Sequence, residues 1–211
     1  MKKFELTNEF ITNMFGTKLF RIRALVEFGD VEAGELGGYV EKESNLGHDD
    51  NAWVYGDARV YDNARVYDNA RVYGDAQVSG DARVYDNALV CGNARVYDNA
   101  RVYGDAWVYG NARVCGDALV CGDARVCGNG DYAYAHGFGS VNRTTTFFRL
   151  KDGGVGVRCG CFYGTLAQFR DKIRETHGET KKAQEYLMLA DLMELRFEED
   201  ENEVGNRKYV E

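Results

Sequence analysis

The sequence contains no proline and little of the residues that most often carry chemistry. Its 211 residues include six cysteines and three histidines, whereas average usage of about 5% would give roughly ten prolines. Without proline, the turns must be made by glycine, asparagine or aspartate, and glycine is abundant, with 25 copies. The sequence therefore excludes turns and kinks that depend on proline.

A long apolar run and a secretory signal are also missing. No stretch of about 18 apolar residues occurs, and the first residues lack the apolar core of a signal peptide. The cysteines are not spaced as a disulfide framework, which favours a reducing compartment. We therefore expect a cytoplasmic protein without membrane contact. With 34 acidic against 26 basic side chains, the net charge of −8 weighs against a nucleic-acid binder that relies on phosphate contacts.

What the sequence does contain is a six-residue repeat that runs without insertion over residues 51 to 128. Alanine recurs every six residues from Ala52 to Ala124, and a valine follows two residues after each alanine. Residues 58 to 63, for example, read Ala-Arg-Val-Tyr-Asp-Asn. Thirteen such hexads occur in a single phase, which is the sequence signature of a repeat architecture.

Each hexad predicts a short strand followed by a sharp corner. The pattern Ala-x-Val-x has the two-residue period of a strand, with Ala and Val on one side and Arg and Tyr on the other. The next two residues, such as Gly-Asp or Asp-Asn, tolerate the dihedrals of a corner but lack the Asn-Gly order typical of tight hairpins. The pattern therefore favours a parallel coil that keeps turning in one direction around an interior of Ala and Val.

The repeat and both of its flanks resemble known proteins. The phase Val-x-x-x-Ala-x, as in VYGDAR at 54 to 59, resembles the hexapeptide repeat of left-handed parallel β-helices, in which three hexads make one triangular coil. Residues 28 to 40 (FGDVEAGELGGYV) resemble the opening of β-solenoid proteins found widely in bacteria and their phages. Residues 147 to 162 resemble the C-terminal module of phage and prophage members. The resemblance implies a phage or prophage origin and a location in the cytoplasm of a bacterial host. It supplies no catalytic residues.

We expect caps at both ends of the repeat, because the open ends of a solenoid carry unpaired strand groups. Residues 1–47 predict an N-terminal β cap, and residues 48–138 are assigned to the repeat. Residues 139–211 predict a small ββαα module with an acidic tail. The expected fold is thus mainly β: a left-handed parallel β-solenoid with three hexads per coil and a cap at each end.

The ββαα module is predicted from local patterns. Two strands are expected over 144–150 and 155–162. A capping-box pattern from Thr165 to Gln168 predicts a helix that ends near residue 178, and a second helix is expected from about 180 to 197.

Three hexads per coil would sort the outward residues into three faces. The first face is the most apolar, and its composition is typical of protein interface hot spots. An exposed apolar stripe normally meets a partner or a second copy, so we expect a homodimer or homotrimer. Stacking between coils, at about 0.5 to 1 kcal/mol per contact, would also explain the repeated Tyr and Arg, and this alternative stays open. The candidate partner-binding or self-binding residues are Trp53, Tyr55, Arg71, Tyr73, Leu89, Trp107, Tyr109 and Arg125.

The leading hypothesis is a non-enzymatic interaction protein. Given the phage resemblance, its concrete form is an accessory protein that binds and inhibits a host factor, in the manner of an anti-CRISPR protein. One alternative is an acyltransferase-like enzyme that uses His48 or His136, because many left-handed hexapeptide helices are acyltransferases.

A second alternative is a sponge that sequesters a nucleotide signal with Arg149, Arg158 and Tyr163. No cofactor or metal is expected, because the repeat cysteines fall on different faces or on distant coils and the sequence clusters no ligand set.

Overall fold

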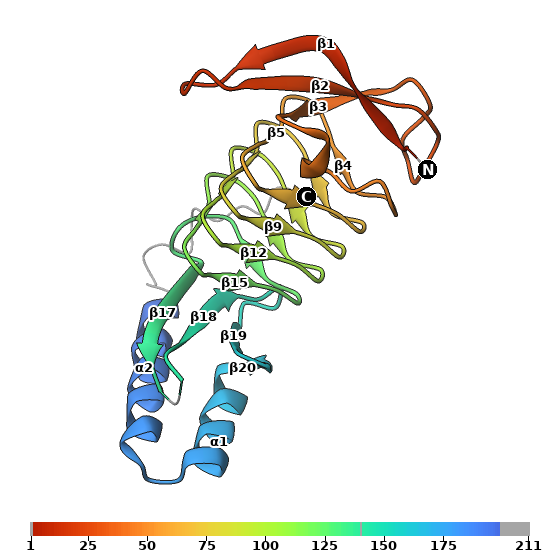
Figure 1. Cartoon of the computed structure of the whole chain (residues 1–211). Helices are drawn as coiled ribbons and strands as arrows, with labels where there is room; N and C mark the ends of the chain where they lie inside the picture. The colour runs from red at the N-terminus through yellow and green to blue at the C-terminus, as the bar shows by residue number, and fades with distance from the viewer. Residues whose placement is uncertain (1, 140, 199–211) are drawn as a thin grey trace.

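The hexads form a parallel β-solenoid, as predicted (Figure 1). The computed structural model describes residues 2–139 and 141–198. Each hexad supplies one two-residue strand. These strands are β4 (Trp53–Val54), β5 (Arg59–Val60), β6 (Arg65–Val66), β7 (Arg71–Val72), β8 (Gln77–Val78), β9 (Arg83–Val84), β10 (Leu89–Val90), β11 (Arg95–Val96), β12 (Arg101–Val102), β13 (Trp107–Val108), β14 (Arg113–Val114), β15 (Leu119–Val120) and β16 (Arg125–Val126).

Strands three hexads apart pair in parallel, so the predicted three hexads per coil are confirmed. The register joins Arg71 to Leu89 and Leu89 to Trp107, a step of 18 residues each time. We call the sheet of β4, β7, β10, β13 and β16 the first face, that of β5, β8, β11 and β14 the second, and that of β6, β9, β12 and β15 the third. The left-handed sense of the coil stays a prediction.

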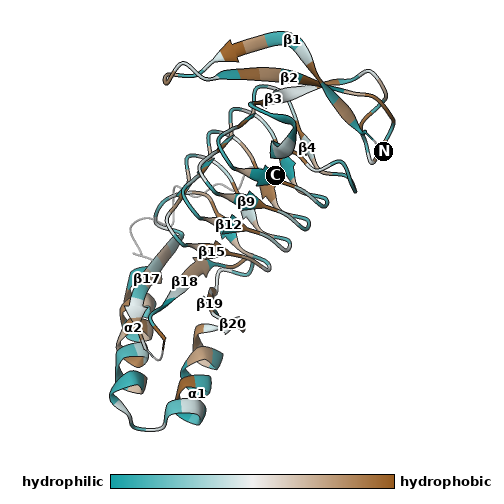
Figure 2. Ribbon diagram, viewed as in Figure 1, coloured by the Kyte–Doolittle hydropathy of each residue, from teal (hydrophilic) through white to brown (hydrophobic). Residues whose placement is uncertain are grey.

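The interior of the solenoid contains the repeat alanines and valines and excludes water from all of them. Each of these side chains, from Ala52 to Val126, is 0% exposed. Figure 2 shows hydrophobic and hydrophilic colours alternating along the coils, as the two-residue period of a strand requires. The residues between them point outward, so the coil leaves one row of outward positions before each valine and a second row after it.

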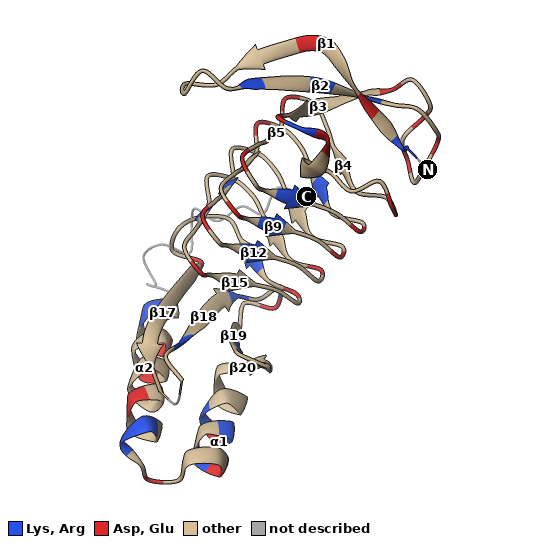
Figure 3. Ribbon diagram, in the orientation of Figure 1, with Lys and Arg blue, Asp and Glu red and all other residues tan. Residues whose placement is uncertain are grey.

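The corners of the repeat from Gly56 to Gly122 each begin with a residue whose φ is positive, either glycine or aspartate. At Gly80, with φ at 66°, a Cβ atom would lie only 2.8 Å from the backbone nitrogen of Asp98 in the next coil. Asp98 itself adopts a φ of 58°, and its carboxylate accepts a hydrogen bond from Gly116 N at 3.1 Å. The predicted turn chemistry is therefore confirmed, and it places acidic side chains along the corners while the arginines occupy the strands (Figure 3).

The N-terminal cap extends the second face. It consists of β1 (Phe4–Thr12), β2 (Lys18–Ala24), β3 (Leu36–Val40) and the short 3-10 helix η1 (Glu43–Asn45). β1, β2 and β3 pair antiparallel, and β3 then pairs in parallel with β5. A continuous seven-stranded sheet thus runs from the cap along the second face, and its strands β1, β2 and β3 lie at one end of the solenoid (Figure 1).

The cap donates hydrogen bonds to carbonyl groups that the first coil would otherwise leave without a partner. Tyr39 N donates to Ala58 O at 2.9 Å, and the Asn45 side-chain amide donates to Ala64 O at 2.8 Å. The buried Lys3 ammonium donates to Ala52 O at 2.9 Å and to two neighbouring carbonyls. Burial lowers the pKa of Lys3 to about 8.

The C-terminal module differs from the predicted ββαα arrangement because its sheet has four strands. They are β17 (Tyr132–Phe138), β18 (Arg143–Arg149), β19 (Val155–Cys159) and β20 (Phe162–Thr165), all antiparallel in that order. The assignment of residues up to 138 to the repeat is therefore wrong for β17, which belongs to this sheet. The predicted strand 155–162 is divided by a turn at Gly160, where φ is 58°.

The two predicted helices are present as α1 (Leu166–His177) and α2 (Lys181–Phe197). Thr165 and Gln168 form the predicted capping box of α1, and the helix ends at Gly178. Phe147 packs against the helices, whereas its neighbour Phe148 packs against the solenoid. The sheet therefore lies between the last coil and the helices. The predicted acidic tail from residue 199 onward lies outside the described residues.

Side chains of the C-terminal module also accept hydrogen bonds from the last coil. Leu119 N donates to Thr146 Oγ1 at 2.9 Å, Arg113 N donates to Asn129 Oδ1 at 2.9 Å, and Cys127 N donates to Asp131 Oδ2 at 2.9 Å. These N–H groups belong to the outward rows, whose members elsewhere in the solenoid donate to the next coil. The module thus replaces a missing coil with side-chain oxygens.

We expect Thr146→Val to destabilise the protein by about 1–3 kcal/mol, because the valine keeps the shape of the buried side chain but leaves the part-buried Leu119 N–H without its acceptor. Urea unfolding would measure the loss. Thr144→Val is the matched control, since among the described residues the hydroxyl of Thr144 bonds the exposed His136 ring alone, and its loss should cost no more than about 0.5 kcal/mol. Equal effects of the two substitutions would contradict the capping role of Thr146.

Candidate functional site

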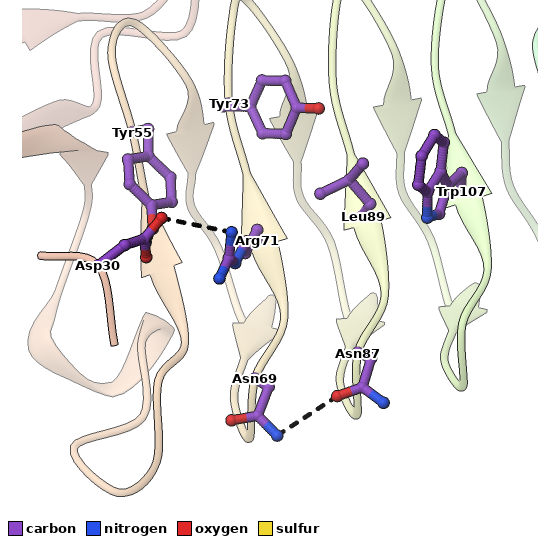
Figure 4. A pocket seen from close by; sticks show the side chains of 8 residues that line it. All are labelled: Asp30, Tyr55, Asn69, Arg71, Tyr73, Asn87, Leu89 and Trp107. Atoms are coloured by element: carbon purple, nitrogen blue, oxygen red, sulfur yellow. Dashed lines mark hydrogen bonds and ion pairs between the residues drawn. The ribbon is translucent and has the colours of Figure 1, made fainter. Parts of the chain in front are cut away.

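The structure arranges the candidate residues of the first face in two rows along the solenoid axis (Figure 4). The row before the valines contains Trp53, Arg71, Leu89, Trp107 and Arg125, and each of these is paired in register with the next. The row after the valines contains Tyr55, Tyr73, Cys91, Tyr109 and Cys127. Parallel pairing thus brings the predicted residues onto one face.

The predicted exposure of Trp53 is wrong, because its side chain is 0% exposed. Phe4 and Phe28 of the N-terminal cap pack edge-on against the indole, with ring centroids 6.2 and 5.3 Å away. A Cβ atom at Gly37 would lie 2.7 Å from the indole, so only glycine allows β3 to approach so closely. Trp53, an outward residue of the first coil, is thus buried in a core that it shares with the cap.

An open hollow of about 740 Å³ lies beside the cap, and the candidate residues that line it are Tyr55, Arg71, Tyr73, Leu89 and Trp107. Asp30, which the sequence did not single out, closes one end of it. Tyr55 Oη donates a hydrogen bond to Asp30 Oδ1 at 3.0 Å, and Arg71 Nη1 forms an ion pair with Asp30 Oδ2 at 3.4 Å. The only sequence signal for Asp30 is its place in the Phe28–Val31 turn, whose ends are joined by a β-bridge. The pairing neutralises the charge of Arg71 at this end of the hollow.

The other end of the hollow is apolar and rigid. Trp107 is 44% exposed and Tyr73 is 38% exposed, with the half-buried Leu89 beside them. The Arg125 guanidinium lies 4.4 Å from the centre of the Trp107 ring system and is itself held by hydrogen bonds to Asp105 O and Ala124 O, both at 2.9 Å. One face of the indole is therefore covered by Arg125.

Tyr55 and Tyr73 of the first face remain protonated over the physiological pH range. Burial raises the pKa of Tyr55 to about 12, and the hydrogen bond to the Asp30 carboxylate adds to this shift. Burial also raises the pKa of Tyr73 to about 12, with a hydrogen bond to Cys91 as the next cause. Both phenols therefore act as neutral hydrogen-bonding groups.

The residues proposed for a nucleotide site do not converge. Arg149 lies on the helix side of its sheet, where it donates to Gly153 O and Phe197 O at 3.0 Å. Arg158 and Tyr163 are paired in register on the opposite side, where Arg158 lies 6.0 Å from the Tyr103 ring. The expectation that these three residues could hold one nucleotide is wrong, because Arg149 lies on the opposite side of the sheet from Arg158 and Tyr163.

Both histidines considered for catalysis make local contacts near the ends of the solenoid. His48 stacks on Phe4 with ring centroids 4.5 Å apart, accepts a hydrogen bond from Lys3 N at 3.2 Å and contacts Glu43 Oε1 at 2.9 Å. His136 is exposed and contacts Thr144 Oγ1 at 2.9 Å. Within residues 2–139 and 141–198, no group of three or more His, Cys, Asp or Glu side chains is placed to hold a metal ion.

The repeat is similar to a known family of solenoids. The family model described as YdcK Beta solenoid repeat matches residues 64–80, 76–92, 94–110 and 106–122. Among curated proteins, no relative matches the chain. The family match agrees with the fold of the repeat, while the predicted phage or prophage origin and the resemblance of the C-terminal module stay predictions. Neither of the described helices is long and apolar enough to cross a bilayer.

We expect Asp30→Asn to lower the pKa of Tyr55 from about 12 toward the ordinary value of 10, because the substitution removes a negative charge beside the phenolate. Titration of ¹³C-labelled tyrosines by NMR, assigned with Tyr55→Phe, would measure the change. Tyr73 in the same sample is the control, since burial and Cys91 rather than Asp30 raise its pKa. A Tyr55 pKa unchanged in Asp30→Asn would contradict the arrangement.

The same shifts predict how stability depends on pH. The pKa values of Tyr55 and Tyr73 are higher in the folded protein than the ordinary 10 of an unfolded chain. Their stabilising contribution is therefore complete below pH 10 and is lost as the pH rises to about 12. Urea midpoints of wild type and Tyr55→Phe, compared across this range, should converge as the pH rises.

Proposed function

We propose that the protein is a non-enzymatic interaction protein that binds a macromolecular partner through the apolar end of the first face. The observation that carries this proposal is the cluster of the exposed Tyr73 and Trp107 with the half-buried Leu89 between them, on three successive coils of a rigid backbone (Figure 4). Trp and Tyr are the residues that most often dominate the binding energy of protein interfaces.

The rigidity of this cluster favours binding. Each backbone position is fixed by hydrogen bonds to the next coil, such as Tyr73 N to Val90 O at 3.0 Å. Trp107 is held against Arg125, so little side-chain entropy remains to be lost on association. Arg71 is already paired with Asp30, which limits the number of bare charges that a partner would have to desolvate. These features support a protein surface as the partner.

The acyltransferase-like alternative receives less support from the geometry. His48 is engaged by Phe4, Lys3 and Glu43, which is the environment of a capping residue. His136 lies on the exposed strand β17, beside an open groove of about 330 Å³ that contains Arg101 and Arg143. His136→Ala should therefore leave binding of the partner intact. Loss of function in the His136→Ala variant would favour the enzyme.

A narrower form of the proposal is a phage or prophage protein that inhibits a host factor and forms a homodimer or homotrimer in the bacterial cytoplasm. The host and inhibitory parts rest on the resemblance of residues 28 to 40 and 147 to 162 to phage and prophage members. Self-association rests on the same exposed cluster as partner binding, because a second copy is one way to cover Trp107.

The double variant Leu89→Arg/Trp107→Arg tests the proposal with little risk to the fold, because arginine already occupies eight of the thirteen equivalent positions in the repeat. The tagged wild-type protein should retain a stoichiometric partner from bacterial lysate. The double variant should bind it at least about 30-fold more weakly, as loss of a hot spot of about 2 kcal/mol or more requires. Light scattering on the purified proteins would show whether the molar mass falls as well.

Gln77→Arg is the matched control, since it adds an arginine at the same repeat position on the second face. It should leave both the partner and the molar mass unchanged. Retention of the partner and of the molar mass by the double variant would contradict the proposed surface.

A further inference from the structure

A separate cleft lies in the C-terminal module, at the open end of the layer between the sheet and the helices. One end of each of four elements lines it: the first residue of β18 (Arg143), the last of β19 (Cys159), the first of β20 (Phe162) and the last of α1 (His177). The cleft has a volume of about 240 Å³. Because it lies on the helix side of the sheet, it is independent of the first face and of the function proposed above.

The floor of this cleft is aromatic. The rings of Phe162 and Phe169 are 5.4 Å apart between centroids, and Phe169 meets Tyr186 edge-on at 5.8 Å. The His177 imidazole stacks on Tyr186 at 5.9 Å. Thr145 Oγ1 donates a hydrogen bond to Cys159 Sγ at 3.2 Å, so the inner wall is polar but uncharged. These groups would contact a flat ring on several sides.

The rim of the cleft is basic although the chain as a whole has a net charge of −8. Arg143, Lys172 and His177 line it, and none of the described lining side chains is a carboxylate. The Arg143 guanidinium lies over the Gly160 turn and has no hydrogen bond or ion pair with any residue in the described ranges. Lys172 pairs with Glu175 at 2.7 Å, but both side chains are more than half exposed, so water weakens that pair. The rim therefore offers uncompensated positive charge.

From this geometry we propose that the cleft binds a small organic anion that carries one aromatic ring, with its carboxylate at Arg143 and its ring on Phe162, Phe169 and Tyr186. The volume is below the roughly 300–1,000 Å³ of sites for drug-sized ligands, and it fits a single ring. The charge of the anion complements the rim, and its ring complements the floor.

Thiol labelling provides a test, because Cys161 lines the cleft and is exposed. An anionic reagent, dithiobis-nitrobenzoate, is compared with the neutral reagent dithiodipyridine. In either reaction the thiolate attacks one sulfur of the reagent, forms a mixed disulfide and releases one aryl thiolate. Peptide mass spectrometry resolves Cys161 from the exposed Cys127 of the solenoid. The ratio of anionic to neutral rates should be about tenfold higher at Cys161 than at Cys127.

Arg143→Gln should reduce this ratio at Cys161 several-fold without changing it at Cys127. Arg174→Gln is the matched control, because Arg174 lies on α1 together with the lining residues Lys172 and His177, pairs with Asp171 at 3.3 Å and does not itself line the cleft. A decrease of the same size in both variants would overturn the proposal, since it would reveal a general field rather than a site. Circular dichroism would verify that both variants fold.

Protection by a ligand then distinguishes an anion site from an apolar cleft. Sodium benzoate should slow the labelling of Cys161 by dithiodipyridine, whereas benzyl alcohol at the same concentration should not. The protection should disappear in Arg143→Gln. Equal protection by the two compounds, or none by benzoate, would overturn the proposal whatever the outcome for the first face.

Discussion

The backbone hydrogen bond from one coil to the next is the interaction on which the rest of the structure depends. Arg71 N donates to Ala88 O at 3.0 Å, and Tyr73 N donates to Val90 O at 3.0 Å, so each outward row repeats the same step of 17 residues. The step holds only if every coil has the same length and every corner the same dihedrals. Proline would delete a donor from this ladder, which accounts for its absence from the repeat. Only the outward side chains are left free to vary.

Because the ladder is directional, the two ends of the solenoid need different chemistry. The first coil presents carbonyl groups of Ala and Val, and the N-terminal cap meets them with donors such as the Lys3 ammonium and the Asn45 amide. The last coil presents outward N–H groups, and the side-chain oxygens of Asn129 and Thr146 accept hydrogen bonds from them. The caps therefore close the ladder chemically as well as covering it, and they remove the open edges through which a solenoid would polymerise.

The sequence predicts features that are fixed locally and misses those that depend on distant segments. The strand-and-corner hexad, the turn chemistry and both helices follow from periodicity and capping residues, which act within a few positions, whereas three hexads per coil is what the resemblance to left-handed β-helices implies. The burial of Trp53 depends on Phe4 and Phe28, which approach it only after the cap folds. Asp30 reaches Tyr55 across 25 residues in the same way. Within the candidate surface, sequence reasoning thus finds the rows but not which of their members the cap removes from solvent.

The 18-residue period has a consequence for how the length of such a protein can change. Gain or loss of three hexads would keep Trp107 in register with Leu89 and would leave every row on its own face. A change of one or two hexads would instead rotate everything beyond that point by a third or two thirds of a turn relative to the N-terminal cap. The C-terminal module, with its helices and cleft, would then point in another direction. Insertions and deletions in whole coils adjust the distance between the two ends, whereas those of single hexads redirect one end with respect to the other.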